Sequence, residues 1–170
     1  TAVAGNYDIV VNQLATGSKV ASAPFDAGAA SAVSAGKMTI EQNGNAYEID
    51  VADGATLQTV RDQINKQLSV QGISANIVNG EGGARLVLSS TTTGAGSDLK
   101  VSGIPELEID GTAQMSDSSG GYVTAIAQDS ELTIDGLTVK SSKNTISDAI
   151  SGITLELTGV SPKSGSTGTA

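Results

Sequence analysis

The chain of 170 residues contains no cysteine, no histidine and no tryptophan. Without histidine there is no imidazole to serve as acid, base or metal ligand. Without cysteine there is no thiolate nucleophile, no disulfide, and no zinc or iron–sulfur site built on sulfur. An enzyme of this composition would have to work from carboxylates and hydroxyls alone. Exported proteins can also lack disulfides, so the missing cysteines do not identify the compartment.

Positive charge is also scarce. The chain has 9 Lys and Arg residues against 18 Asp and Glu, which gives a formal net charge of −9 and a sequence pI near 4.2. Nucleic acids and anionic membranes are bound through clustered Lys and Arg, so we expect neither as a partner. No apolar run approaches the ~20 residues that a membrane-spanning helix needs. Residues 1–6 carry no secretory signal pattern, and the first residue is not Met, so we interpret the chain as an excised fragment.

Aromatic residues make up 2% of the chain, whereas Gly, Ser and Thr together make up over a third of it. The apolar side chains are mostly Ala, Val, Ile and Leu, and this composition favours short β-strands with glycine-rich turns over a helix bundle. The hydrophobic content of 38% is enough for modest cores, in one domain of ordinary size or two small ones.

The clearest hydrophobic pattern lies between residues 37 and 90. Alternation at 38–41 and 47–51 predicts two strands joined at Asn43-Gly44, a dipeptide that favours tight hairpins. Thr56 is well placed as the N-cap of a helix. The apolar stripe of this helix consists of Leu57, Val60, Ile64 and Leu68. Alternation at 73–77 and 86–88 then predicts two more strands, so this part indicates an α+β unit whose helix covers an antiparallel sheet.

A second, shorter copy of this order follows after short strands expected at 99–102 and 105–110 and a polar stretch at 114–121 that predicts an exposed turn or a boundary. Residues 132–139 predict a hairpin around Asp135-Gly136. The spacing of Thr145 and Asp148 fits a capping box, which predicts a short helix ended by Gly152 and followed by a last strand at 153–157.

The ends of the chain are less regular. Residues 7–15 predict a strand, with 19–22 as its continuation. The small-residue stretch 21–36 predicts a linker or crossing loop, with a mobile helix as the alternative. The tail 163–170 is expected to be disordered or to be the trimmed end of a fragment.

The remaining enzymatic option is a pair of carboxylates, as in glycoside hydrolysis. Glu106, Glu108 and Asp110 alternate along the predicted strand 105–110 and so share one face. We interpret them as a solvated strand face, because Leu107 and Ile109 would form the opposite, buried face. Aromatic sugar platforms are also nearly absent from the chain.

Other candidate sites also have ordinary explanations. The glycine-rich stretches 80–83 and 94–96 lack the Lys-Ser/Thr step of phosphate loops, so we interpret them as turns. Asp110 and Asp117 lack the spacing of a calcium loop. The helix stripe is expected to face the core, with a partner-binding groove as the alternative, and Arg61 and Lys66 are expected to be solvated. We therefore predict no catalytic, cofactor-binding or metal-binding residues.

Several stretches resemble one family, the bacterial flagellar filament cap proteins, also called hook-associated protein 2. Residues 127–162 (AQDSELTIDGLTVKSSKNTISDAISGITLELTGVSP) resemble its signature for the return into the middle domain. Residues 53–65 (DGATLQTVRDQIN) are similar to the flagellin and hook-protein motif T-L-x-x-(I/V)-x-x-x-I-N. Residues 7–22 and 76–90 also resemble the family.

The resemblance implies a discontinuous domain organisation. Residues 1–36 and 123–170 would form a middle domain, and residues 37–122 would form an outer domain inserted into it. We therefore expect an α+β, β-rich fold of two small domains of antiparallel strands, each with a short covering helix. The coiled-coil and leg segments of the family are not recognisable here, since neither end shows a heptad pattern.

The function implied is structural and needs no catalysis. A ring of several copies would cap the distal end of the flagellum, outside the cell, and promote the folding and polymerisation of exported flagellin. The partners would be other copies of the chain and flagellin, with interface residues that the sequence does not identify. The alternative is a surface adhesin, or another flagellar axial or phage-tail β-domain, that binds host glycans or proteins. Its sugar-stacking aromatics would be limited to Tyr7, Tyr47 and Tyr122.

Overall fold

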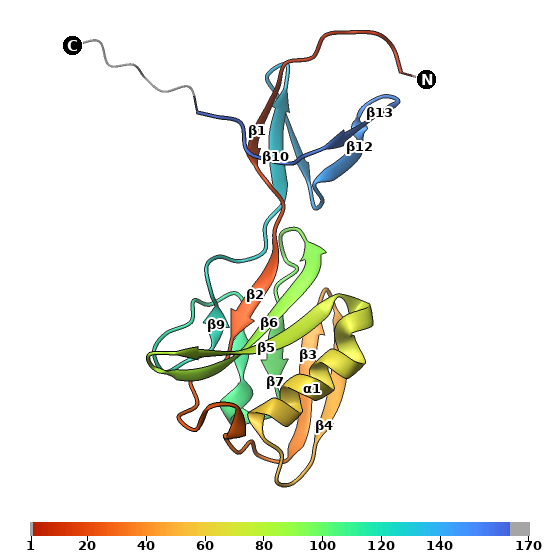
Figure 1. Cartoon of the computed structure of the whole chain (residues 1–170). Coiled ribbons are helices and arrows are strands. Elements are labelled where there is room, and N and C mark those ends of the chain that lie inside the picture. Colours follow the sequence, from red (N-terminus) through yellow and green to blue (C-terminus); the bar gives the residue numbers. More distant parts are fainter. Residues whose placement is uncertain (1, 164–170) are drawn as a thin grey trace, which may run out of the picture.

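The computed structural model describes residues 2–163, so almost all of the predicted tail 163–170 lies outside the described residues. The described chain forms two units joined by a narrow neck (Figure 1). The larger unit contains residues 17–127, and the smaller unit contains residues 7–16 and 128–163. Each unit has its own hydrophobic cluster, and the two clusters share no residue.

The larger unit consists of two four-stranded sheets and a helix, with strand orders β5-β6-β2-β9 and β4-β3-β7-β8. Its elements are β2 (Gly17–Ala21), β3 (Gly36–Gln42), β4 (Asn45–Val51), α1 (Leu57–Leu68), β5 (Ile73–Gly80), β6 (Gly83–Thr93), β7 (Lys100–Ser102), β8 (Ile109–Asp110) and β9 (Gly121–Tyr122). Three short 3-10 turns are η1 (Gly28–Ala30), η2 (Ser69–Gln71) and η3 (Pro105–Leu107). All strand pairs within these two sheets are antiparallel.

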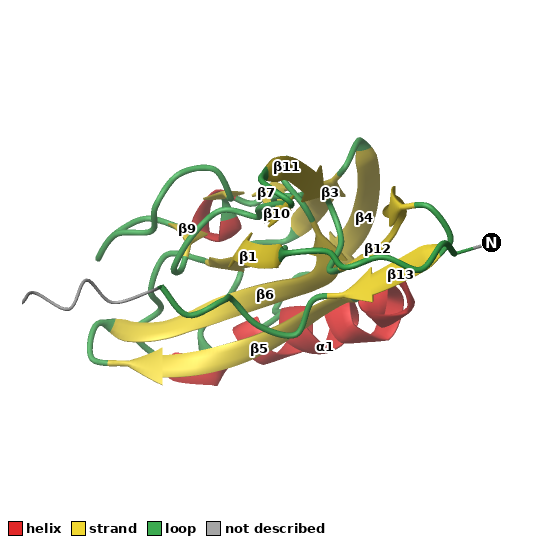
Figure 2. Ribbon diagram, turned by 90° about the horizontal axis from the view of Figure 1, so that it is seen from above, coloured by secondary structure: helices red, strands yellow, loops and turns green. Residues whose placement is uncertain are grey.

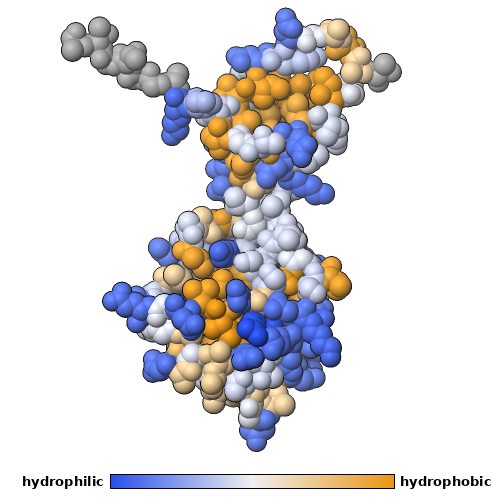
Figure 3. Space-filling view, in the orientation of Figure 1, coloured by the Kyte–Doolittle hydropathy of each residue, from blue (hydrophilic) through white to orange (hydrophobic). Residues whose placement is uncertain are grey.

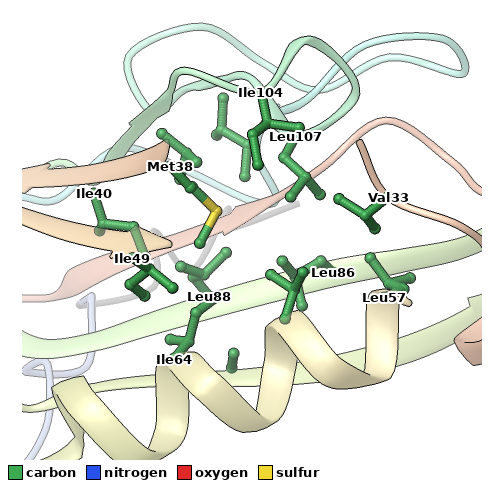
Figure 4. Packing of buried hydrophobic residues seen from close by; sticks show 14 of the residues in the cluster. Val33, Met38, Ile40, Ile49, Leu57, Ile64, Leu86, Leu88, Ile104 and Leu107 are labelled. Atoms are coloured by element: carbon green, nitrogen blue, oxygen red, sulfur yellow. The ribbon is translucent and has the colours of Figure 1, made fainter. Parts of the chain in front are cut away.

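Helix α1 confirms the prediction from its local sequence. The Thr56 hydroxyl accepts from the Thr59 amide at 3.3 Å, and the Thr59 hydroxyl in turn accepts from the Thr56 amide. The four apolar stripe residues are all buried, so the stripe faces the core and is not a partner groove. Figure 4 shows Leu57 and Ile64 pointing towards Leu86 and Leu88 of β6.

Both predicted two-residue hairpins are confirmed. Asn43 and Gly44 have φ values of 53° and 77°, and they join β3 to β4. Asp135 and Gly136 have φ values of 49° and 82°, and they join β10 (Ser130–Ile134) to β11 (Leu137–Ser141) in the smaller unit. Positive φ at both loop positions matches the right-handed twist of the flanking strands, which is why Asn-Gly and Asp-Gly favour this turn.

The smaller unit contains a three-stranded sheet of order β1-β10-β11 and a separate hairpin of β12 and β13. The bounds are β1 (Ile9–Gln13), β10 (Ser130–Ile134), β11 (Leu137–Ser141), β12 (Thr145–Ile150) and β13 (Ile153–Glu156). The sheet and the hairpin together enclose the smaller cluster, whose buried members are Leu132, Ile134, Ile146, Ile150 and Leu157.

The predicted second helix is wrong, because residues 145–150 form strand β12. The spacing of Ile146 and Ile150 fits one face of a helix, but it also fits an irregular strand. Ile146 pairs with Leu155 and Ile150 with Ile153, so β12 carries extra residues between these pairs. Gly152, with φ of 77°, lies in the hairpin turn and does not end a helix. The described residues therefore contain an antiparallel, β-rich α+β fold with one α-helix.

The loop predicted at 21–36 is also confirmed, apart from its two end residues, because Ala21 ends β2 and Gly36 begins β3. Its only helical piece is the turn η1, and Val33 is buried in the larger cluster. Strand β2 lies within the segment 1–36, yet it pairs with β6 on one side and β9 on the other. The segment 1–36, predicted to belong to the middle domain, thus supplies a central strand to the larger unit.

Candidate interaction surface

The three carboxylates considered for catalysis do not form a shared site. Residues 105–107 form the 3-10 turn η3, so Glu106 does not lie on one strand face with Asp110 as predicted. Glu106 accepts a hydrogen bond from the Ser34 amide, while Asp110 accepts from the amide and hydroxyl of Thr112 at 3.0 and 2.7 Å. Each of these two carboxylates therefore holds a neighbouring loop segment in place.

The electrostatics of these two carboxylates agree with that role. Burial raises the pKa of Glu106, but hydrogen bonds from Ser34 outweigh it, so the pKa lies below its usual value. Hydrogen bonds from the Thr112 hydroxyl and amide lower the pKa of Asp110. A general acid needs the opposite shift, because it must hold a proton near neutral pH.

The other sequence candidates are dispersed turns and surface residues. Gly80 pairs with Gly83 to close the β5–β6 hairpin. Arg61 forms an ion pair with Asp62 at 2.6 Å, and Lys66 is exposed. Among residues 2–163, no three acidic residues lie close enough to hold a metal ion, and no helix is long and apolar enough to cross a membrane.

The most distinctive surface is a groove on the larger unit. Helix α1 lies against one face of the sheet β5-β6-β2-β9 (Figure 2), whereas the other face is open to solvent. The groove on this open face encloses about 480 Å³. Its apolar lining is Ala21, Val78, Val87, Met115 and Val123, and its charged residues are Lys19, Glu81, Arg85 and Asp117. We call this surface the sheet groove.

One wall of the sheet groove is held in place by Arg85. Its guanidinium donates to the carbonyl oxygens of Ser22 at 2.7 Å, Ser116 at 2.6 Å and Ser119 at 3.2 Å. The last two bonds attach the loop 115–120 to the sheet. At the base of this loop, the lack of a side chain at Gly121 lets β9 lie close to residues 113–115, because a Cβ there would lie 2.3 Å from the Ala113 oxygen. The turn predicted at 114–121 is thus a fixed wall of the groove.

The smaller unit carries a second exposed apolar surface. Leu137 is the cross-strand partner of the buried Ile134, yet its side chain is 73% exposed at the turn end of the β10–β11 hairpin. Val10 and Val160 are also exposed, at 40% and 53%. Figure 3 shows apolar surface on the visible face of this unit and a patch bordered by hydrophilic residues on the larger one. This incomplete covering is typical of surfaces that contact partners.

Sequence reasoning missed the sheet groove because its residues come from separate segments that meet only in the folded chain. A weak signal existed in the strands themselves. Val78 and Val87 occupy outward positions of β5 and β6. In an antiparallel sheet with one face in solvent, such outward positions normally carry polar residues.

The chain matches two family models: the Flagellin hook IN motif at residues 37–92 and the Flagellar hook-associated protein 2 C-terminus at residues 127–169. It is 42% identical to A-type flagellar hook-associated protein 2 of Pseudomonas aeruginosa, over 92% of this chain and 36% of that protein. It is 36% identical to flagellar hook-associated protein 2 of Escherichia coli K12, over 86% of this chain and 33% of that protein. The chain therefore spans about a third of the length of these relatives.

Solved structures agree with these matches. The crystal structure of FliD (HAP2) from Pseudomonas aeruginosa PAO1 has a TM-score of 0.85 and 37% identity, and the match covers 95% of this chain and 76% of that chain. The D2-D3 domains of the flagellar cap protein FliD from Escherichia coli match with a TM-score of 0.78 and 33% identity, over 95% of this chain and 85% of that one. The resemblance seen in the sequence is thereby confirmed, and the chain belongs to the flagellar hook-associated protein 2 (FliD) family.

Proposed function

We propose that this chain is part of a structural cap at the distal end of the bacterial flagellum. There it would promote the folding and polymerisation of exported flagellin into the filament. The observation that carries this proposal is the match of 95% of the chain to the Pseudomonas aeruginosa FliD structure. The Escherichia coli structure, which is similar along the same share of the chain, is described as the flagellar cap protein.

The cap would act outside the cell and without catalysis. Two of its three candidate carboxylates hold neighbouring loop segments, and the chain has neither histidine nor cysteine. We propose other copies of the chain and flagellin as its partners. No observation favours the adhesin, because Tyr7 lies in the smaller unit, Tyr47 on β4 and Tyr122 on β9, and none of them lines the sheet groove.

We further propose that a second copy covers the sheet groove in the assembled ring. Rings of more than two subunits use heterologous contacts, in which two different surfaces of each subunit meet. This chain offers two different exposed apolar surfaces, one on each unit. Each copy carries a net charge of −9, so copies repel one another, and we expect the contact to be weak in this chain alone.

The domain organisation proposed here keeps the insertion but moves its boundaries. Strand β2 pairs with β6 and β9, and Val33 belongs to the larger cluster. These contacts support boundaries near residues 16 and 128 instead of 36 and 123. The larger unit would then be the inserted outer domain, and the smaller unit the middle domain.

The proposed location can be tested by labelling an introduced cysteine, since this part of the parent protein contributes none of its own, with cells carrying the unsubstituted parent treated in parallel. A single exposed residue such as Gln67 can be replaced by Cys in the parent protein, and swimming cells can be treated with an impermeant maleimide dye. We expect one fluorescent spot at the distal end of each filament. Label along the whole filament, or only at the cell surface, would contradict the cap proposal.

A further inference from the structure

The neck between the two units contains no shared apolar core. The chain crosses it twice, and the two crossings form an antiparallel bridge between Thr16 and Gln128, with N–O distances of 3.0 and 3.3 Å. No residue of the larger cluster belongs to the smaller cluster. The relative orientation of the units therefore depends on polar contacts at the neck.

One loop of the larger unit reaches across to the smaller unit. This is the loop 93–98, which begins at the end of β6. The Ala95 amide donates to Asp129 Oδ1 at 2.7 Å, and the Thr93 hydroxyl donates to the Ser142 carbonyl at 2.6 Å. We call these two hydrogen bonds the neck contact.

Gly94 is the residue that lets this loop approach so closely. Its φ is +110°, and a Cβ there would lie 2.6 Å from the Cβ of Ser142. Any side chain at position 94 would therefore push the loop away from the smaller unit. Gly96 in the same loop differs, because its φ is +80° but a Cβ there would have no neighbour within 4 Å. A substitution at Gly94 would therefore strain the backbone and also disturb the contact between the units. A substitution at Gly96 would strain the backbone alone.

The smaller unit also holds its own end of the neck. The Asn144 side chain accepts from the Ala15 amide at 2.7 Å and donates to the Ala15 carbonyl at 2.9 Å. Beside the neck contact lies an open polar cleft of about 480 Å³, lined by both units. The cleft residues are Asn43, Thr91, Thr92, Thr93, Ser97, Ser142 and Lys143. Space for rotation therefore exists next to the contact.

We propose that the neck contact holds the two units in one relative orientation, and that breaking it lets them rotate about the neck while both hydrophobic clusters stay folded. The device belongs to the chain itself and does not depend on the cap function. Its consequence for an assembly is that the angle between the units is fixed before any partner binds.

Distances between spin labels test this proposal directly. Gln67 on α1 and Thr138 on β11 are exposed and make no side-chain hydrogen bond to other residues of 2–163, so both can be replaced by Cys and labelled specifically. We expect one narrow distance distribution in the otherwise unchanged chain. The variants Gly94→Ala and Asp129→Ala should each broaden it, because each removes one side of the neck contact.

Two matched variants serve as controls. Asp129→Asn keeps an oxygen that accepts from Ala95, and Gly96→Ala adds a methyl group in open space, so both should keep the narrow distribution. Amide chemical shifts should change only near residues 93–98 and 127–144 in the two disrupting variants. A distribution that is already broad without disruption would overturn the proposal. So would an unchanged distribution in Asp129→Ala, or global unfolding of either disrupting variant.

Discussion

Asn65 is the last residue of the matched T-L-x-x-V-x-x-x-I-N stretch, and the structure gives it a measurable role in stability. Its amide nitrogen donates to the Ala75 carbonyl at 2.9 Å, and its amide oxygen accepts from the Ala75 amide at 2.7 Å. Strand β5 is the edge of its sheet, so no other strand pairs with this side of Ala75. The side chain of Asn65 thus provides hydrogen-bond partners for both the amide and the carbonyl of Ala75 on this edge strand.

The variant Asn65→Ala should lower the free energy of unfolding by about 2–3 kcal/mol. Each net hydrogen bond contributes roughly 1 kcal/mol, and a partly buried backbone group left without a partner adds a desolvation penalty of about 1 kcal/mol or more. The higher helix propensity of Ala offsets a few tenths of a kcal/mol of this loss. For a chain of this size the melting temperature should then fall by roughly 5–10 °C.

Urea unfolding followed by circular dichroism at the helix signal would measure this change in the larger unit. Gln67→Ala provides a matched control, because Gln67 is an exposed residue on the same helix. The control should stay within about 0.5 kcal/mol of the unchanged chain. If Asn65→Ala were as stable as Gln67→Ala, the two hydrogen bonds to Ala75 would contribute nothing to the free energy of unfolding, contrary to this prediction.

Three further predictions concern the sheet groove and the hydrogen bonds between Asp110 and Thr112. Arg85→Ala should speed amide hydrogen exchange in residues 115–120, since the guanidinium bonds that hold this loop are lost; unchanged exchange would contradict that role. The depressed pKa of Asp110 means that its contribution to stability is present above its unfolded value of 3.8 and is lost as pH falls through the folded pKa. In Thr112→Val, an NMR titration should find the pKa of Asp110 raised relative to the unchanged chain, and an identical pKa would exclude Thr112 as its cause. Val87→Glu in the parent protein should weaken ring assembly and filament growth, whereas Val70→Glu, at an 84% exposed position outside the groove, should not. Equal effects of these two variants would argue against the groove as a contact between copies.

The parts of the fold that the sequence predicted are those decided by neighbouring residues. The turns at Asn43-Gly44 and Asp135-Gly136 depend on two residues each, and helix α1 depends on one cap and one stripe. The helix predicted from the capping-box spacing of Thr145 and Asp148 is wrong, because that spacing is also compatible with a strand and pairing with β13 selects the strand. Local sequence patterns do not determine which segments pair with each other in the folded chain.

The candidate surface depended even more on distant pairing. Strand β2 lies between β6 and β9, which are far away in the sequence, so no local pattern assigned it to the larger unit. The sheet groove forms only after that pairing brings Ala21 beside Val87. The absence of histidine and cysteine, by contrast, is read directly from the sequence and excludes imidazole and thiolate side chains from any site in this chain.

The proposed role of the parent protein is to cap the growing filament. The most direct test deletes its gene and compares flagellin in the culture medium with flagellin assembled on the cells. We expect monomeric flagellin in the medium, short or absent filaments and no swimming in the deletion strain, and we expect the intact gene to restore filaments and swimming. Filaments of normal length and number in the deletion strain would contradict it.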